Sequence, residues 1–124
     1  MPHILLVDDD ERLRDVFTEF LTGSGYQVHV APNGRIAWEL LERQPFDLVI
    51  TDLVMPDMEG IEFITKLRKA GHSVPIIAMT GGGQDRAIYL TLAEKLGADR
   101  ILKKPFALAE LLDAVSSAIS SVLG

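Results

Sequence analysis

The chain has 124 residues, of which 48% are hydrophobic and 24% are charged, a composition typical of an ordinary globular domain rather than of a disordered or coiled-coil chain. The absence of cysteine excludes disulfides, thiolate metal sites and thiol nucleophiles. The net charge of −6 argues against a direct nucleic-acid partner and suits a divalent cation. Because no apolar run approaches the ~18 residues of a membrane span and the start lacks a signal-peptide pattern, we expect a cytoplasmic protein without membrane association.

Short apolar runs alternate with longer segments of helical period along the chain. In chain order, the runs predicted as strands are His3–Val7, Gln27–Ala31, 47–51, 75–79 and Arg100–Lys103. Most of them read as continuous apolar segments, as expected for parallel strands that are covered on both faces.

A helical segment follows each run. The first has apolar residues at i, i+3, i+4, i+7 and i+8 from Leu13, and Gly23 and Gly25 indicate its end. The later segments have apolar residues at similar spacing, beginning at Ile36, Ile61, Ala87 and Leu108. This (βα)5 alternation predicts an α/β fold with an open, doubly wound five-stranded parallel sheet, in a single domain over residues 1–124.

Polar side chains stand where four of the predicted strands end. In chain order they are Asp8, Asp9, Asp10, Asp52, Thr80, Lys103 and Lys104. Because the carboxyl ends of parallel strands meet at one edge of the sheet, and ligands of open α/β folds bind at that edge, we expect these groups to gather there.

Each of these residues also has a purely structural interpretation. Asp10 suits the N-cap of the first helix, which is its preferred role, and Asp52 could begin an Asx turn. Thr80 could be an ordinary strand-end hydroxyl, and Lys104 a surface lysine. The structural interpretations are weaker when taken together, because crowded carboxylates repel one another unless a cation or an ammonium group neutralises them.

The chemistry open to such a cluster is restricted. Carboxylates with water and a backbone carbonyl suit Mg²⁺, and a carboxylate nucleophile that attacks phosphorus forms an aspartyl phosphate. Phosphoryl transfer requires mainly positioning and neutralisation of charge. No phosphate-binding loop of the GxxxxGK[ST] type is present, so a P-loop nucleotide site is not indicated.

At this point the chain resembles the receiver domain of bacterial two-component response regulators, the CheY-like family, over essentially its whole length. Four blocks carry the resemblance: ILLVDDD at 4–10, DLVITDLVMPDMEG at 47–60, PIIAMTG at 75–81 and GADRILKKPF at 97–106. The resemblance implies a flavodoxin-like sheet with strand order 2-1-3-4-5.

It also implies a role for each site residue. Asp52 would accept a phosphoryl group from the phosphohistidine of a sensor histidine kinase or phosphotransfer protein. Mg²⁺ would be held by Asp8, Asp9, Asp52 and the backbone carbonyl of Val54. Thr80 and Lys104 would bind the phosphoryl group, and Lys104 is preferred to Lys103 because it directly precedes the proline. The protein would be a signalling phosphoacceptor rather than an enzyme, switching a downstream protein or an output domain.

Three departures from the family pattern affect the expected signalling. Ile101 stands where the family often has an aromatic switch residue, so a switch through an aromatic rotamer is not expected. Thr80 and Ile101 are the residues expected to pass the change on phosphorylation to a partner. The interval from Thr80 to Lys104 is about two residues longer than usual in the family, with the extra length in 81–85. Val54 and Gly82 occupy the positions that flank the hydrolytic water, and neither has a side chain that can hydrogen-bond it, so self-dephosphorylation is expected to be slow.

Other function classes fit less well. An aspartate-nucleophile phosphatase would need a second carboxylate at the position of Val54. An interaction module that works without phosphorylation would not need the complete residue set. The histidines His3, His29 and His72 are far apart in the pattern, so no metal or general-base role is expected for them. The chain could be a stand-alone receiver or a domain excised from a larger regulator.

Overall fold

The computed structural model describes residues 1–53, 59–81, 91 and 94–123. Its five strands form one parallel sheet in the order β2-β1-β3-β4-β5, which confirms the predicted fold class and strand order. The strands are β1 (His3–Val7), β2 (Gln27–Ala31), β3 (Leu48–Asp52), β4 (Ile76–Thr80) and β5 (Arg100–Lys103). The third and fourth strands lie one residue later than predicted.

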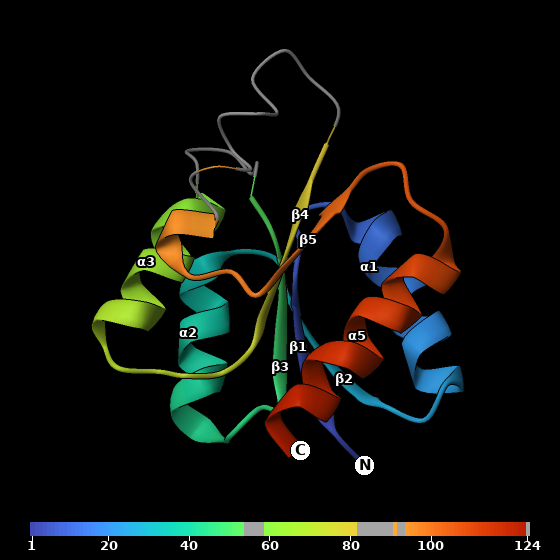
Figure 1. Ribbon diagram of the computed structural model, residues 1–124, viewed down its shortest axis with the longest axis horizontal. Coiled ribbons are helices and arrows are strands. Elements are labelled where there is room, and N and C mark those ends of the chain that lie inside the picture. Colours follow the sequence, from blue (N-terminus) through green and yellow to red (C-terminus); the bar gives the residue numbers. More distant parts are fainter. Residues whose placement is uncertain (54–58, 82–90, 92–93, 124) are drawn as a thin grey trace.

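The described helices cover both faces of this sheet (Figure 1). On one face lie α1 (Glu11–Gly23) and α5 (Leu108–Leu123), and on the other lie α2 (Gly34–Arg43) and α3 (Glu59–Lys69). The helix predicted through Ala87, Leu90 and Ala93 falls largely outside the described residues. No helix among the residues described has both the length and the apolar character needed to cross a membrane.

The core consists of two apolar layers divided by the sheet. Along β1, Ile4 and Leu6 pack toward α1 and α5, whereas Leu5 and Val7 pack toward α2 and α3. Every residue of β3 and β4 is buried, because each of these strands has a neighbour on both sides and helices on both faces. This burial explains why their sequences are continuous rather than alternating apolar runs.

Side-chain caps begin the first two helices. Asp10 accepts hydrogen bonds from the backbone N–H groups of Arg12 (2.9 Å) and Leu13 (3.3 Å), which confirms its preferred interpretation as an N-cap. Asn33 accepts one from Ile36 (2.9 Å) at the start of α2. The loop after β1 is therefore anchored to α1 by Asp10, which leaves its two neighbours Asp8 and Asp9 available for another role.

The prediction that the histidines lie far apart is wrong for His3 and His29. These two rings are 5.5 Å apart between centroids, because β1 and β2 are neighbouring strands whose register pairs His3 with Gln27, so that His29 is its diagonal neighbour on the same face. His72 lies elsewhere, edge-on to Trp38.

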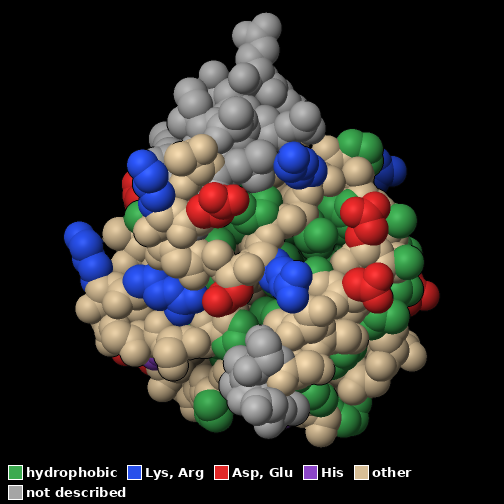
Figure 2. Space-filling view, viewed as in Figure 1, with side chains coloured by type: hydrophobic (Ala, Val, Ile, Leu, Met, Phe, Trp, Pro, Cys, Tyr) green, Lys and Arg blue, Asp and Glu red, His purple; other side chains and the backbone are tan. Residues whose placement is uncertain are grey.

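Charged side chains of both signs are interspersed over the face of the molecule shown in Figure 2. Among the described residues on that face, Lys and Arg side chains do not form one continuous basic stripe of the kind that neutralises nucleic-acid phosphates.

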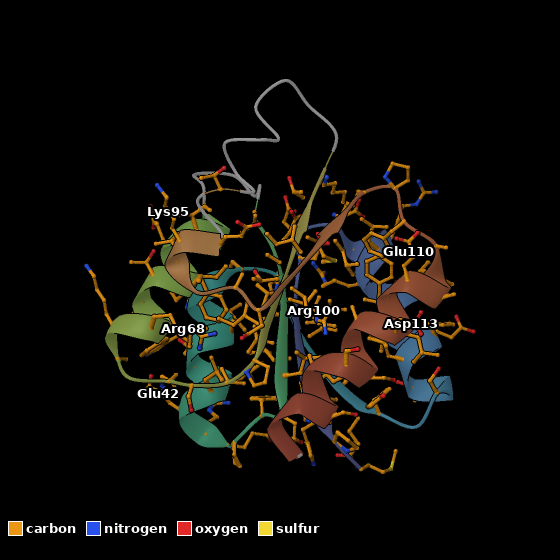
Figure 3. All side chains as sticks on the ribbon, viewed as in Figure 1. Glu42, Arg68, Lys95, Arg100, Glu110 and Asp113 are labelled. Carbon is orange, nitrogen blue, oxygen red and sulfur yellow. The ribbon has the colours of Figure 1, made fainter. Side chains whose placement is uncertain are left out.

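Arg68 of α3 (Figure 3) binds the two loops that lead into β4 and β5. Its guanidinium donates to the carbonyls of His72 (2.8 Å), Val74 (2.9 Å) and Gly97 (2.7 Å). It also reaches Asp99 at 3.3 Å, and Asp99 in turn accepts from the backbone N–H of Ile76. Arginine has five N–H donors in one rigid plane, so it can bind several acceptors at once in a way that lysine could not reproduce.

We predict that Arg68→Met lowers the free energy of unfolding by about 1–3 kcal/mol, because several carbonyls lose a charged donor at once. Urea denaturation measures this. The matched control is Arg35→Met, since Arg35 makes an exposed i,i+4 pair with Glu39 of a kind worth only ~0.5 kcal/mol. Equal losses for the two variants would contradict the role given to Arg68.

Candidate functional site

The carboxyl ends of the strands form the edge of the sheet opposite the two chain termini (Figure 1). Neighbouring strands end level with one another there: Asp52 is paired with Met79, and Thr80 with Lys103. Backbone hydrogen bonds continue past the ladder, from Lys104 N–H to the Thr80 carbonyl (2.7 Å) and from Leu53 N–H to the Met79 carbonyl (2.9 Å). Asp52, Thr80 and the Lys103–Lys104 pair therefore stand at one edge of the sheet.

Three carboxylates meet at this edge. Asp8, Asp9 and Asp52 each offer an oxygen atom, and these atoms lie within 4.8 Å of one another. Asp8 is fully buried and Asp52 is 6% exposed, whereas Asp9 faces solvent. Two of the three carboxylates are thus buried, and the third lies at the protein surface.

Lys104 provides the positive charge among them. Its Nζ lies 2.9 Å from Asp52 Oδ2 and 3.4 Å from Asp8 Oδ2. The preceding residue, Lys103, is exposed, as strand alternation requires of neighbours. The choice of Lys104 over Lys103 for this edge thus agrees with the positions of the two side chains.

The pKa values of this group follow from burial and charge. Burial raises the pKa of Asp8, and the charge of Asp52 adds to this, while the N–H of Asp10 (2.9 Å) and Lys104 act in the opposite direction. For Lys104, burial alone would lower the pKa, but the hydrogen bond and charge of Asp52, with the charge of Asp8, outweigh it and raise the pKa. Lys104 therefore stays an ammonium ion at neutral pH.

Thr80 is fully buried at the end of β4. Its hydroxyl donates to the carbonyl of the next residue, Gly81, at 3.4 Å. Ile101 is half-buried on β5 and packs against the apolar layer beside α2 and α3. Val54 and Gly82 lie outside the described residues.

Gly60 is a residue of the site that the sequence interpretation did not single out. It is the second residue of α3, and a Cβ added there would collide with the carbonyl oxygen of Asp52 and come within 2.8 Å of Leu53 Cα. A signal was present in the sequence, because glycine in a helix costs ~0.5–1 kcal/mol relative to alanine and needs a reason such as close backbone approach. The start of α3 thus rests directly on the backbone of Asp52.

The donor set has the chemistry of a magnesium site. Carboxylate oxygens are hard ligands, and Mg²⁺ takes one or two of them while keeping several waters. The residues fit such an ion because Asp8 and Asp52 approach from adjacent strands and Asp9 lies at the solvent side. The described residues could therefore hold a divalent cation beside Lys104.

The model of the response regulator receiver domain family matches residues 4–116. The chain belongs to this family. It is 38% identical to the response regulator MprA of Mycolicibacterium vanbaalenii over 88% of this chain and 46% of that protein. It is 36% identical to the DNA-binding transcriptional regulator NtrC of Azospirillum brasilense, over 95% of this chain and 24% of that protein.

A solved receiver structure shares the fold. The CheY-like response regulator receiver domain protein of Methanospirillum hungatei superposes with a TM-score of 0.89 at 28% identity, over 98% of this chain and 95% of that one. The receiver domain thus matches both solved and curated response regulators, whereas it spans only about a quarter to a half of the length of the two curated relatives.

We predict that Gly60→Ala weakens the binding of Mg²⁺ and lowers the free energy of unfolding by about 1–3 kcal/mol, the usual cost of overpacking. The added methyl must push the backbone of Asp52, which carries one of the three carboxylates. Magnesium titration and urea denaturation measure the two effects.

The matched control is Gly23→Ala at the end of α1, where a Cβ would meet no heavy atom of the described residues within 4 Å. This control should keep its Mg²⁺ affinity and its stability. If Gly60→Ala also left both unchanged, the close approach of α3 to Asp52 would not constrain the site.

Proposed function

We propose that this receiver domain carries a phosphoryl group on Asp52, received from the phosphohistidine of a sensor histidine kinase or phosphotransfer protein with Mg²⁺ bound. The observation that supports this most is the contact of Lys104 with both buried carboxylates. Asp52 is a buried carboxylate that could act as the nucleophile, and Lys104 provides a positive charge beside it. Asp8 and Asp9 would contribute by holding a cation, whose charge would neutralise the phosphoryl oxygens together with Lys104.

In the proposed step, an oxygen of Asp52 attacks phosphorus and forms the new P–O bond. The P–N bond of the donor phosphohistidine breaks, and its electron pair leaves with the imidazole, which then holds or takes up a proton. No oxidant or further reactant is needed. The reaction is a transfer of one group to this chain, so the domain acts as a phosphoacceptor and not as an enzyme that turns over a substrate.

Asp8, Asp9 and Asp52 would hold Mg²⁺, together with the backbone carbonyl of Val54 that the family resemblance implies. When bound, the ion supplies positive charge that neutralises the phosphoryl oxygens. Lys104 would move its hydrogen bond from Asp52 to a phosphoryl oxygen. Thr80 would turn its hydroxyl from the Gly81 carbonyl to the same group.

The signal would then pass from Thr80 along the edge of the sheet. The Lys104 N–H already bonds the Thr80 carbonyl, and Ile101 lies on β5 next to β4. We propose that a downstream protein, or an output domain of a longer chain, reads this change in the cytoplasm. Direct nucleic-acid binding by residues 1–124 is not proposed, since their net charge is −6.

The chemistry is tested by incubating the chain with acetyl phosphate and Mg²⁺ and measuring its intact mass. We expect the mass to rise by one phosphoryl group for the wild type and not at all for Asp52→Asn. Asp113→Asn is the matched control, because Asp113 is an exposed aspartate on α5 (Figure 3), and it should behave as the wild type. Uptake by Asp52→Asn would overturn the proposal.

A second prediction concerns the lifetime of the phosphoryl group. Because neither Val54 nor Gly82 can hydrogen-bond the attacking water with a side chain, we expect slow loss of the group after the donor is removed. Val54→Asn should hasten this loss, since its amide can orient a water molecule. Time-resolved intact mass measures both rates, and a wild type as rapid as quick chemotaxis-type receivers would contradict the prediction.

A further inference from the structure

A pair of histidines lies near the edge of the sheet that is opposite the carboxylates. His3 begins β1 and His29 is the middle residue of β2. The register pairs His3 with Gln27 and Leu5 with His29, so the two histidines project from the same face at neighbouring positions. Both are half-buried, and both belong to parts of the molecule that the proposed phosphoryl chemistry does not use.

The ring nitrogens of the pair converge. His3 Nδ1 lies 3.4 Å from His29 Nε2, while the ring centroids are 5.5 Å apart and the ring planes differ by only 19°. The nitrogen–nitrogen distance is shorter than the centroid distance by nearly the width of one ring. The two nitrogens therefore lie on the facing sides of the two rings.

A third polar side chain lies beside His29. The amide of Gln44, which ends α2, places its Nε2 3.4 Å from His29 Nε2. The oxygen and nitrogen of a glutamine amide exchange places by a flip, so a carbonyl oxygen can occupy this position. Asp47 accepts the backbone N–H of His3 at 2.7 Å and adds negative charge beside the pair.

The surroundings hold these groups in place. Phe46 packs edge-on to the His29 ring, with 5.3 Å between centroids and 81° between planes. Asp47 also donates its backbone N–H to the His3 carbonyl at 2.8 Å. Residues of the segment from Gln44 to Asp47 thus contact both histidines. These contacts restrict the motion of the side chains before any metal ion binds.

The distance between His3 Nδ1 and His29 Nε2 matches that between two nitrogen ligands of a tetrahedral metal ion. Two nitrogens that each lie ~2.0–2.1 Å from a tetrahedral Zn²⁺ are about 3.4 Å apart, which is the separation seen for His3 and His29. We propose that His3 Nδ1 and His29 Nε2 bind a zinc-type transition metal ion, with the carbonyl of a flipped Gln44 and water as further ligands.

The proposed site differs in kind from the carboxylate site. Imidazole suits Zn²⁺, Cu²⁺ and Ni²⁺, whereas oxygen-only sites suit Mg²⁺. In the metal-bound form each ring would be a neutral imidazole whose proton lies on the nitrogen that does not face the ion. Metal binding would join β1, the edge strand β2 and the end of α2.

The test is calorimetric titration of the full chain with Zn²⁺ in excess Mg²⁺, which occupies the carboxylates. We expect one zinc ion per chain. His3→Gln and His29→Gln should each weaken binding by at least ~10–100-fold, because loss of a ligand costs no less than loss of an outer-shell partner. The matched control is His72→Gln, which should bind zinc as the wild type does.

Thermal unfolding with and without Zn²⁺ gives an independent readout for variants of altered stability. Zinc should raise the melting temperature of the wild type and of His72→Gln, and not that of His29→Gln. Absence of saturable binding would overturn the proposal. So would zinc binding that survives both histidine substitutions, or binding that is lost in Asp52→Asn, since the ion would then lie among the carboxylates.

Discussion

Asp8 is a carboxylate with no exposure to solvent, and a buried charge of this kind is costly unless an opposite charge lies close to it. The ammonium group of Lys104 supplies that charge and is shared with Asp52. The remaining imbalance, three carboxylates against one lysine, makes this edge of the sheet a place that could bind a divalent cation. A bound Mg²⁺ would reduce this excess of negative charge. A phosphoryl group on Asp52 would add negative charge again.

The fold makes this crowding possible without local strain in the strands. Parallel strands bring residues far apart in sequence to one edge, and Asp52 itself still belongs to the ladder of β3 and β4. Asp10 takes up the capping role at α1, so Asp8 and Asp9 need not. Gly60 lets α3 begin against the Asp52 backbone, so the position of Asp52 is held by this helix as well as by the strand ladder.

Much of this could be predicted from sequence, because apolar runs fix the strands and the polar residues stand directly after them. β3 and β4 were predicted only one residue too early. Their last residues, Asp52 and Thr80, are polar and therefore resemble loop residues although they are buried in the sheet. A glycine inside a predicted helix is a signal that Gly60 has a special role, but its contact with the Asp52 backbone could not be predicted. The same holds for the carbonyls bound by Arg68 and for the meeting of His3 with His29. Each depends on packing or strand register between distant segments, which no local pattern records. Val54 and Gly82 remain sequence-based predictions.

The central claim is that Asp52, Asp8, Asp9 and Lys104 act as one phosphoacceptor site. A crystal structure of the chain with Mg²⁺ and beryllium trifluoride, a stable mimic of the phosphoryl group, tests it most directly. We expect the mimic to be bonded to Asp52, the ion to lie against Asp8 and Asp9, and Lys104 to turn from Asp52 to a fluorine atom. A mimic bonded to another carboxylate, or an ion held away from Asp8 and Asp9, would contradict it.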